Sequence, residues 1–175
     1  MQDAYQGQIK DLILGRDFLT WLWFKSETAK GDFVTEAGEP FSLYVEQRIT
    51  VTGGEGDAKE SISVSGLLSE LREAKVGLAM GKKVSKALVR IGQEPDTWHA
   101  VIKAEDFSLS GFKTPKVERE RDEDEDPDAA FLEKMYLVEK GLGFLDEAYA
   151  QFLAVRFSPR WNEECARVRA WLEAD

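Results

Sequence analysis

Apolar residues follow different spacings along the chain, and the first clear pattern is the segment GRDFLTWLWFKSE at residues 15–27. This segment is apolar almost all round, so we expect it to be buried on nearly every side. Its length, with Asp17 as N-cap, favours a short helix, although a run this apolar is also typical of an inner strand. Either alternative places the segment inside the core.

Strict alternation of apolar and polar residues marks the next segments and predicts strands with one buried face. FSLYVEQRITVTG (residues 41–53) and SISVSG (residues 61–66) both alternate, and the turn-rich sequence GGEGD begins the connection between them. We therefore predict an antiparallel hairpin. Further on, the apolar positions of 84–91 and the segment 97–113 predict two or three more strands, with turns at QEPD and AED.

Helical spacing appears in three other places. A short amphipathic helix that ends at Gly81 is predicted by the stripe Leu67, Leu71, Ala74 and Leu78. A long amphipathic helix is predicted where apolar residues recur at steps of four and three, at Phe131, Met135, Val138, Leu142, Leu145, Tyr149 and Phe152. Gly141 and Gly143 at its centre predict a bend or a close contact.

A last helix is predicted after Ser158-Pro159, which is typical of an N-cap followed by a first helical residue. Its expected core stripe is Trp161, Cys165, Val168 and Leu172. Together these elements predict one α+β domain over residues 1–175, with a mostly antiparallel sheet packed against two or three helices. The charged sequence VERERDEDEDPD predicts an exposed acidic connection at about 118–128.

The composition agrees with one globular domain, since 43% of the 175 residues are hydrophobic and 32% are charged. The single cysteine excludes an intrachain disulfide. The N-terminal sequence lacks the pattern of a secretory signal, and no apolar run approaches the ~20 residues of a membrane span. We therefore expect a cytoplasmic protein that does not enter a membrane.

Charge is distributed unevenly along the chain, whose net charge is −10. Residues 72–121 carry 11 Lys or Arg against 7 Asp or Glu, a net charge of +4, whereas residues 122–148 carry 2 against 10. An acidic protein binds nucleic acid only if its positive charge is gathered on one face. The sequence MGKKVSKALVRIG (residues 80–92) lies in the positive segment and raises two alternatives: a phosphate-binding patch, or lysines that only complement a helix end.

Two motifs for bound ions or nucleotides are incomplete. GLAMGKKVS lacks the spacing and the hydroxyl residue of a phosphate-binding loop. The acidic residues from Asp122 to Glu133 have the spacing of a calcium loop, but Pro127 stands where that loop needs glycine. We predict neither a metal site nor a cofactor. His99 and Cys165 have no nucleophile motif around them, so we assign no catalytic residues and expect a protein that is not an enzyme.

Residues 15–155 resemble the C-terminal part of the RdgC family of recombination-associated proteins, without a counterpart of the family's N-terminal half. The likeness lies in the order of elements and in a Gly-Lys-x-Val-x-Lys strand start with a later Leu-x-x-Phe-Lys motif, matched by Gly81, Lys82, Val84, Lys86, Leu109, Phe112 and Lys113. The resemblance implies a protein that binds duplex DNA without sequence preference, forms a ring-shaped homodimer and limits the access of a recombinase to DNA.

Our leading hypothesis is therefore weak, non-specific binding of duplex DNA at the nucleoid. The candidate DNA-binding residues are Lys82, Lys83, Lys86, Arg90, Lys113 and Lys116. The first alternative is a protein-interaction or dimerisation module in which aromatic residues, Trp21 and Trp23 among them, form an apolar patch; its partners would be a second copy or recombination proteins. A second alternative is a metal-dependent nuclease that uses the carboxylates of 122–128.

Overall fold

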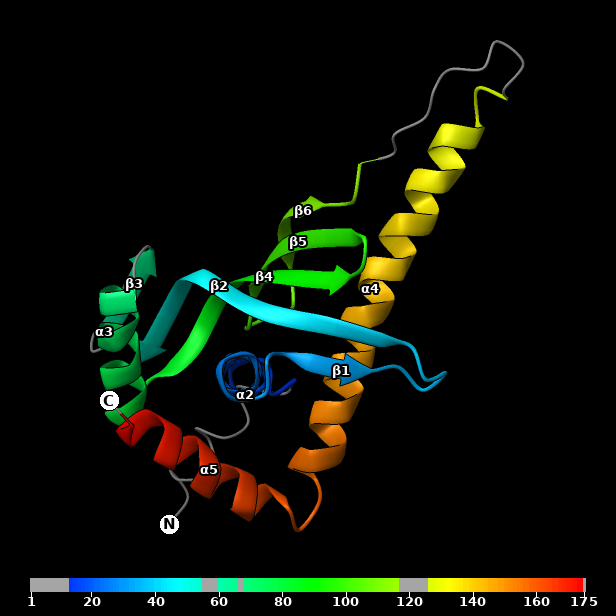
Figure 1. Ribbon diagram of the computed structural model, residues 1–175. Coiled ribbons are helices and arrows are strands. Elements are labelled where there is room, and N and C mark those ends of the chain that lie inside the picture. Colours follow the sequence, from blue (N-terminus) through cyan, green and yellow to red (C-terminus); the bar gives the residue numbers. More distant parts are fainter. Residues whose placement is uncertain (1–12, 55–59, 66–67, 117–125, 175) are drawn as a thin grey trace.

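The computed structural model describes residues 13–54, 60–65, 68–116 and 126–174. Within these ranges, six strands form one antiparallel sheet; three helices pack against it and a fourth packs on two of these helices (Figure 1). The predicted α+β class and the mostly antiparallel sheet are confirmed. Most of the predicted acidic connection lies outside the described residues.

The sheet is organised around the long strand β2 (Pro40–Gly53). β1 (Asp32–Val34) and β3 (Glu60–Ser65) pair with its two ends along one edge, so the predicted hairpin between β2 and β3 is confirmed. Along the other edge β2 pairs with β4 (Lys83–Gln93), which pairs with β5 (Asp96–Lys103), which in turn pairs with β6 (Leu109–Lys113). The predicted turns at QEPD and AED connect the last three strands.

The apolar segment near the start of the chain forms the helix α2 (Gly15–Thr28). Asp17 lies in its first turn, and the prediction that it is the N-cap was wrong, because Leu14 occupies that position. The helix is buried on several sides because β2 and β4 lie beneath it and other helices surround it. Its buried residues are Gly15, Phe18, Leu19, Trp21, Leu22, Trp23 and Phe24.

The predicted short helix is α3 (Leu68–Ala79), which packs against β2 and β3. Ala74 and Leu78 of its predicted stripe are buried. The chain leaves the helix through Gly81, whose φ of 90° is a conformation that glycine adopts without strain. This turn brings the chain directly into β4.

The predicted long helix is α4 (Ala129–Arg156), but its buried face differs from the predicted stripe. Its buried residues are Leu137, Gly141, Phe144, Ala148 and Phe152, of which Phe144 meets the sheet and Phe152 meets α2 and α5. Of the predicted stripe, Phe152 is fully buried, whereas Phe131, Met135 and Leu142 are 63%, 42% and 39% exposed. Apolar residues lie on two sides of this helix, so its spacing alone does not identify the side that meets the sheet.

Gly141 confirms the expected close contact, because a Cβ at this position would lie 2.7 Å from Cδ1 of Trp98. Gly143 has open space around it. We therefore expect Gly141→Ala to lower the free energy of unfolding by about 1–3 kcal/mol through overpacking. Gly143→Ala should raise it by about 0.5–1 kcal/mol, because glycine is a poor helix former. Denaturant unfolding of the two variants measures both changes, and equal shifts would contradict the packing of α4 on Trp98.

The last helix is α5 (Trp161–Glu173), which begins two residues after Pro159. Its deeply buried residues are Glu164 and Trp171, and the predicted stripe, Cys165 included, is only partly buried. Trp21 Nε1 donates a hydrogen bond to Oε1 of Glu164 at 3.0 Å. The contact of α5 with α2 thus includes a polar interaction in addition to the apolar residues that the spacing predicted.

Glu27 at the end of α2 joins three helices. Its carboxylate accepts hydrogen bonds from Nε1 of Trp23 and Nε1 of Trp171, both at 2.8 Å, and it pairs with Nζ of Lys75 on α3 at 3.0 Å. The two indole rings meet edge to face with centroids 5.1 Å apart. This cluster of two indoles, one carboxylate and one ammonium fixes α3 and α5 against α2.

α2, α3 and α4 contact the same face of the sheet, which carries the inward side chains of β2, β4 and β5, and α5 packs on α2 and α3 (Figure 1). The opposite face, here called the outer face, has no helix over it among the described residues. Among those residues, no helix combines the length and the apolar character that spanning a membrane requires.

Candidate nucleic-acid interface

The outer face carries the outward side chains of the strands and is rich in positive charge. In β4 and β5 the buried residues alternate with exposed or half-buried ones, as expected for a sheet covered on one side only. In the described strands its basic side chains are Arg48, Lys86, Arg90, Lys103 and Lys113. The described strands also place two carboxylates on this face, Glu46 of β2 beside the cations and Asp32 of β1 opposite Ser42.

The strand register groups these cations into two rows across the sheet. In one row Lys86 of β4 lies directly opposite Lys103 of β5. In the other row Arg90 lies opposite His99, and His99 lies opposite Lys113 of β6. Like charges directly opposite each other destabilise a sheet, so the first row does not serve the stability of the fold.

The two rows lie about 13 Å apart along the strands. Lys86 and Arg90 are four residues apart on one strand, which corresponds to about 13 Å at ~3.3 Å per residue. The major groove of B-DNA is ~12 Å wide. The separation of the two rows is therefore close to the width of that groove.

Arg90 is held in place by its neighbours. Its guanidinium carbon lies 4.9 Å from the centroid of the Tyr44 ring, and its Nε lies 3.3 Å from Oε1 of Glu46. Nε2 of His99 lies 3.9 Å from the same carboxylate oxygen. Glu46 thus orders the second row, and it also neutralises part of that row's charge.

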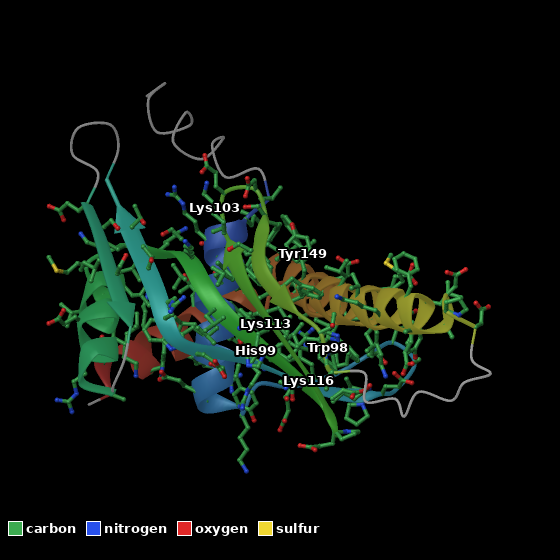
Figure 2. All side chains as sticks on the ribbon, turned by 90° about the horizontal axis from the view of Figure 1, so that it is seen from above. Trp98, His99, Lys103, Lys113, Lys116 and Tyr149 are labelled. Atoms are coloured by element: carbon green, nitrogen blue, oxygen red, sulfur yellow. The ribbon has the colours of Figure 1, made fainter. Side chains whose placement is uncertain are left out.

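The remaining cations of this face are less constrained. Nζ of Lys103 lies 3.6 Å from Oε2 of Glu105 in the turn after β5, and both side chains are largely exposed. Lys86 and Lys113 are exposed and form no ion pair with any residue in the described ranges. Figure 2 shows Lys103, His99 and Lys113 along β5 and β6, with the exposed Lys116 beyond the end of β6.

Two of the six predicted residues do not join the outer face. Lys83 pairs with Oδ1 of Asp17 on α2, and it lines a small pocket between α2 and α5 on the helix-covered side. Lys82 pairs with Oε2 of Glu60 at 2.5 Å and lowers the pKa of that carboxyl, first through the hydrogen bond and then through its charge. The structure therefore brings together Lys86, Arg90 and Lys113, with Lys116 beside them, and separates Lys82 and Lys83 from them.

Lys103 and Arg48 belong to the same face but were missed by the sequence interpretation. The signal for Lys103 was present, because it follows His99 and Val101 at period two on the polar side of a predicted strand. Arg48 precedes the buried Ile49 in the same way. Both residues would have been found if cations had been selected by the face of the strand on which alternation places them, rather than by their closeness along the chain.

Residues with other chemistry do not form a second site in the described part of the chain. No group of three or more His, Cys, Asp or Glu side chains is placed there to hold a metal ion. Most of the acidic run proposed for a nuclease, including Asp122 and Asp124, lies outside the described residues. His99 is half exposed beside Glu46, and Cys165 is half buried on α5.

Comparisons with known proteins gave no match to the chain among protein-family models, curated proteins or solved structures. The functional assignment therefore rests on the chemistry of the outer face and on the resemblance described above.

Proposed function

We propose that the protein binds duplex DNA through the outer face of its sheet, without catalysis and without sequence preference. The observation that carries this proposal is the set of five cations on a sheet face that no described helix covers, against two carboxylates, Glu46 and Asp32, on the described strands of that face. Lysine and arginine on a broad surface contact phosphates, which carry no sequence information. The described face offers no helix or loop that would enter a groove and read bases.

The net charge of −10 is compatible with this proposal because the charge is segregated. A dipolar molecule turns its basic face towards a polyanion and keeps its acidic surface away from it. Binding of this kind releases condensed cations from DNA and weakens steeply as salt concentration rises. A role in recombination rests on the resemblance alone, and it requires the DNA binding tested below.

The proposal predicts a defined salt dependence. If about four cations contact phosphates, log affinity should fall against log salt with a slope of roughly −3 to −4, from ~0.9 per contact. Fluorescence anisotropy with two duplexes of unrelated sequence, each titrated at several salt concentrations, measures this slope. The two duplexes should give the same affinity. Absence of measurable binding at ~50 mM salt would refute the proposal and remove the recombination role with it.

The structure also supplies a matched pair of variants. Replacing Lys86, Arg90 and Lys113 together by alanine should lower the affinity by about 10³-fold at ~50 mM salt and flatten the slope by about 2.7. Replacing Lys82 and Lys83 by alanine removes two cations of the helix side and should leave DNA affinity nearly unchanged. An equal loss in both variants would show that charge, rather than the outer face, determines binding.

A second candidate function, dimerisation, is favoured by a different observation. Trp21 and Trp23, expected in an apolar patch, are buried, so the patch predicted there was wrong. Exposed apolar side chains instead lie on the first turns of α4, which extend beyond the sheet (Figure 1). They are Phe131, Leu132, Met135 and Tyr136, here called the α4 patch. Contiguous apolar surface of this kind is typical of protein interfaces.

We expect sedimentation equilibrium to distinguish this candidate from the first. A dimer formed through the α4 patch should have twice the chain mass of 19.8 kDa and should dissociate when Phe131 and Tyr136 are both replaced by serine. Phe157→Ser removes a phenyl ring elsewhere that is 76% exposed, more than Phe131 at 63%, and should leave the dimer intact. A parent protein that stays monomeric at about 100 μM would exclude a dimer of useful affinity.

A further inference from the structure

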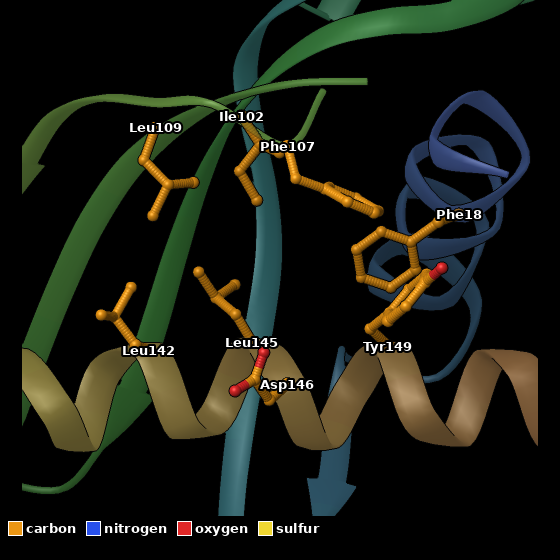
Figure 3. A pocket seen from close by; sticks show the side chains of 8 residues that line it. All are labelled: Phe18, Ile102, Phe107, Leu109, Leu142, Leu145, Asp146 and Tyr149. Carbon is orange, nitrogen blue, oxygen red and sulfur yellow. The ribbon is translucent and has the colours of Figure 1, made fainter. Parts of the chain in front are cut away.

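A pocket of about 350 Å³ lies between α4 and the strands β5 and β6, on the helix-covered side of the sheet. In Figure 3, Leu142 and Leu145 point from α4 across the pocket towards Ile102 and Leu109. These four side chains form aliphatic walls. Leu142 is 39% exposed and marks the side on which the pocket meets solvent. The pocket is separate from the outer face, so its occupant does not depend on DNA binding.

One end of the pocket is aromatic. The rings of Phe18, Phe107 and Tyr149 meet edge to face in all three pairs, with centroids 5.0–5.7 Å apart (Figure 3). Phe107 has a φ of 55°, and its turn is held by a hydrogen bond from the Ser108 amide to Oδ1 of Asp106 at 2.9 Å. The Tyr149 hydroxyl donates to the Ile13 carbonyl at 2.8 Å. The aromatic end is therefore already ordered by contacts within the protein.

Asp146 supplies the one charged group among the residues that line the described pocket. It follows Leu145 on α4, is exposed, and forms no ion pair with any residue in the described ranges. A carboxylate at the rim of an apolar pocket attracts a cation whose apolar part can enter while its charged end stays partly hydrated. The same carboxylate, in a protein of net charge −10, repels anions.

We propose that this pocket binds a small aryl-alkyl ammonium compound, with its ring against Phe18, Phe107 and Tyr149 and its ammonium group at Asp146. The volume is near the lower end of the ~300–1,000 Å³ range of ligand pockets. At ~30 Å³ for each water-sized group, it accommodates roughly ten non-hydrogen atoms. Aromatic ligands gain from edge-to-face contacts with the rings already present.

Three ligands of nearly equal shape test the proposal: phenethylamine, 2-phenylethanol and 3-phenylpropionate, titrated into the ¹⁵N-labelled full chain at neutral pH. Phenethylammonium should bind with a Kd on the order of 1 mM and shift the amide signals of Phe107, Leu109 and Leu142. The alcohol should bind about two- to fivefold more weakly, as expected for loss of one exposed ion pair. The carboxylate should bind most weakly.

Two variants separate the contribution of the Asp146 charge to ligand affinity from the contribution of the pocket's shape. Asp146→Asn should abolish the preference for the ammonium over the alcohol and leave the affinity for the alcohol unchanged. Leu142→Trp places a larger side chain at the mouth and should weaken all three ligands, while an unchanged melting temperature shows that the fold is kept. Equal affinities for the three ligands in the parent, or no shifts at these residues at about 10 mM ligand, would overturn the proposal.

Discussion

Phe144→Ala should lower the free energy of unfolding by about 3–5 kcal/mol, the cost of removing a buried phenyl ring. Phe144 is 3% exposed and lies where α4 meets the sheet. Its ring stacks on Phe41 at a centroid distance of 4.7 Å and meets Trp98 edge to face at 5.6 Å. Neither neighbour can close the cavity without losing its own contacts, because both are buried on β2 and β5. Urea unfolding followed by circular dichroism measures the change.

Phe131→Ala is the matched control, since it removes the same ring from the same helix. Phe131 is 63% exposed, so the change in unfolding free energy should stay within about 0.5 kcal/mol. A large loss at Phe131 with a small loss at Phe144 would mean that the helix is rotated, with the sequence-predicted stripe facing the sheet. A dimer formed through the α4 patch would make the Phe131 result depend on protein concentration, and this dependence would reveal the dimer.

Glu27→Ala should destabilise the protein by about 2–5 kcal/mol, because it leaves the indole N–H groups of Trp23 and Trp171 without their acceptor. Each unsatisfied buried donor costs ~1–3 kcal/mol. Trp23 is 1% exposed and Trp171 is 8% exposed, so water does not readily replace the lost carboxylate. Thermal unfolding monitored by tryptophan fluorescence reports the loss directly from the affected side chains.

Glu27→Gln separates the hydrogen bonds from the charge. The glutamine oxygen can still accept a hydrogen bond from an indole, but it offers no ion pair to Lys75. We expect a loss of about half that of the alanine variant. If the two variants were equally stable, with values near the parent, the carboxylate would not hold α5 against α2.

Much of the fold could be predicted from the sequence because most segments show one clear period. The alternation in 41–53 and 84–91 identifies strands, and the turn residues that follow each of them indicate hairpins, which are the pairs β2–β3 and β4–β5. The segment 15–27 could not be assigned to a helix or a strand by periodicity, since nearly every position is apolar. The structure explains why this helix shows no helical period: two strands lie beneath α2 and helices flank it, so residues on most of its sides are buried.

The orientation of α4 could not be predicted for a related reason. One set of apolar residues, including Leu137, Phe144 and Phe152, is buried, and a second set, including Met135 and Leu142, is exposed or borders a pocket. The second set has the more regular heptad-like spacing. Of the two glycines inside the helix, Gly141 lies on the buried side against Trp98, whereas Gly143 has open space around it, so a helical glycine alone did not identify the buried side either.

Charge along the chain identified three of the five cations that the described strands place on the outer face, Lys86, Arg90 and Lys113. The lysines and arginine around β4 were recognised because they are close in sequence, but closeness in sequence does not separate the two faces of a strand. Lys82 and Lys83 precede the regular alternation of β4 and are engaged by Glu60 and Asp17, carboxylates that are distant in the sequence. Such partners become neighbours only after folding.

The contact between α2 and α5 bears on how the chain reaches its native state. Trp21 meets its acceptor Glu164 across 143 residues, and Trp171 meets Glu27 across 144. During synthesis α2 is therefore made long before the helix that shields its indoles, and its apolar side chains stay uncovered in the interval. Proteins that depend on contacts between residues distant in sequence fold slowly, and their intermediates expose apolar surface that is prone to aggregation. We thus expect the growing chain to recruit chaperones through α2.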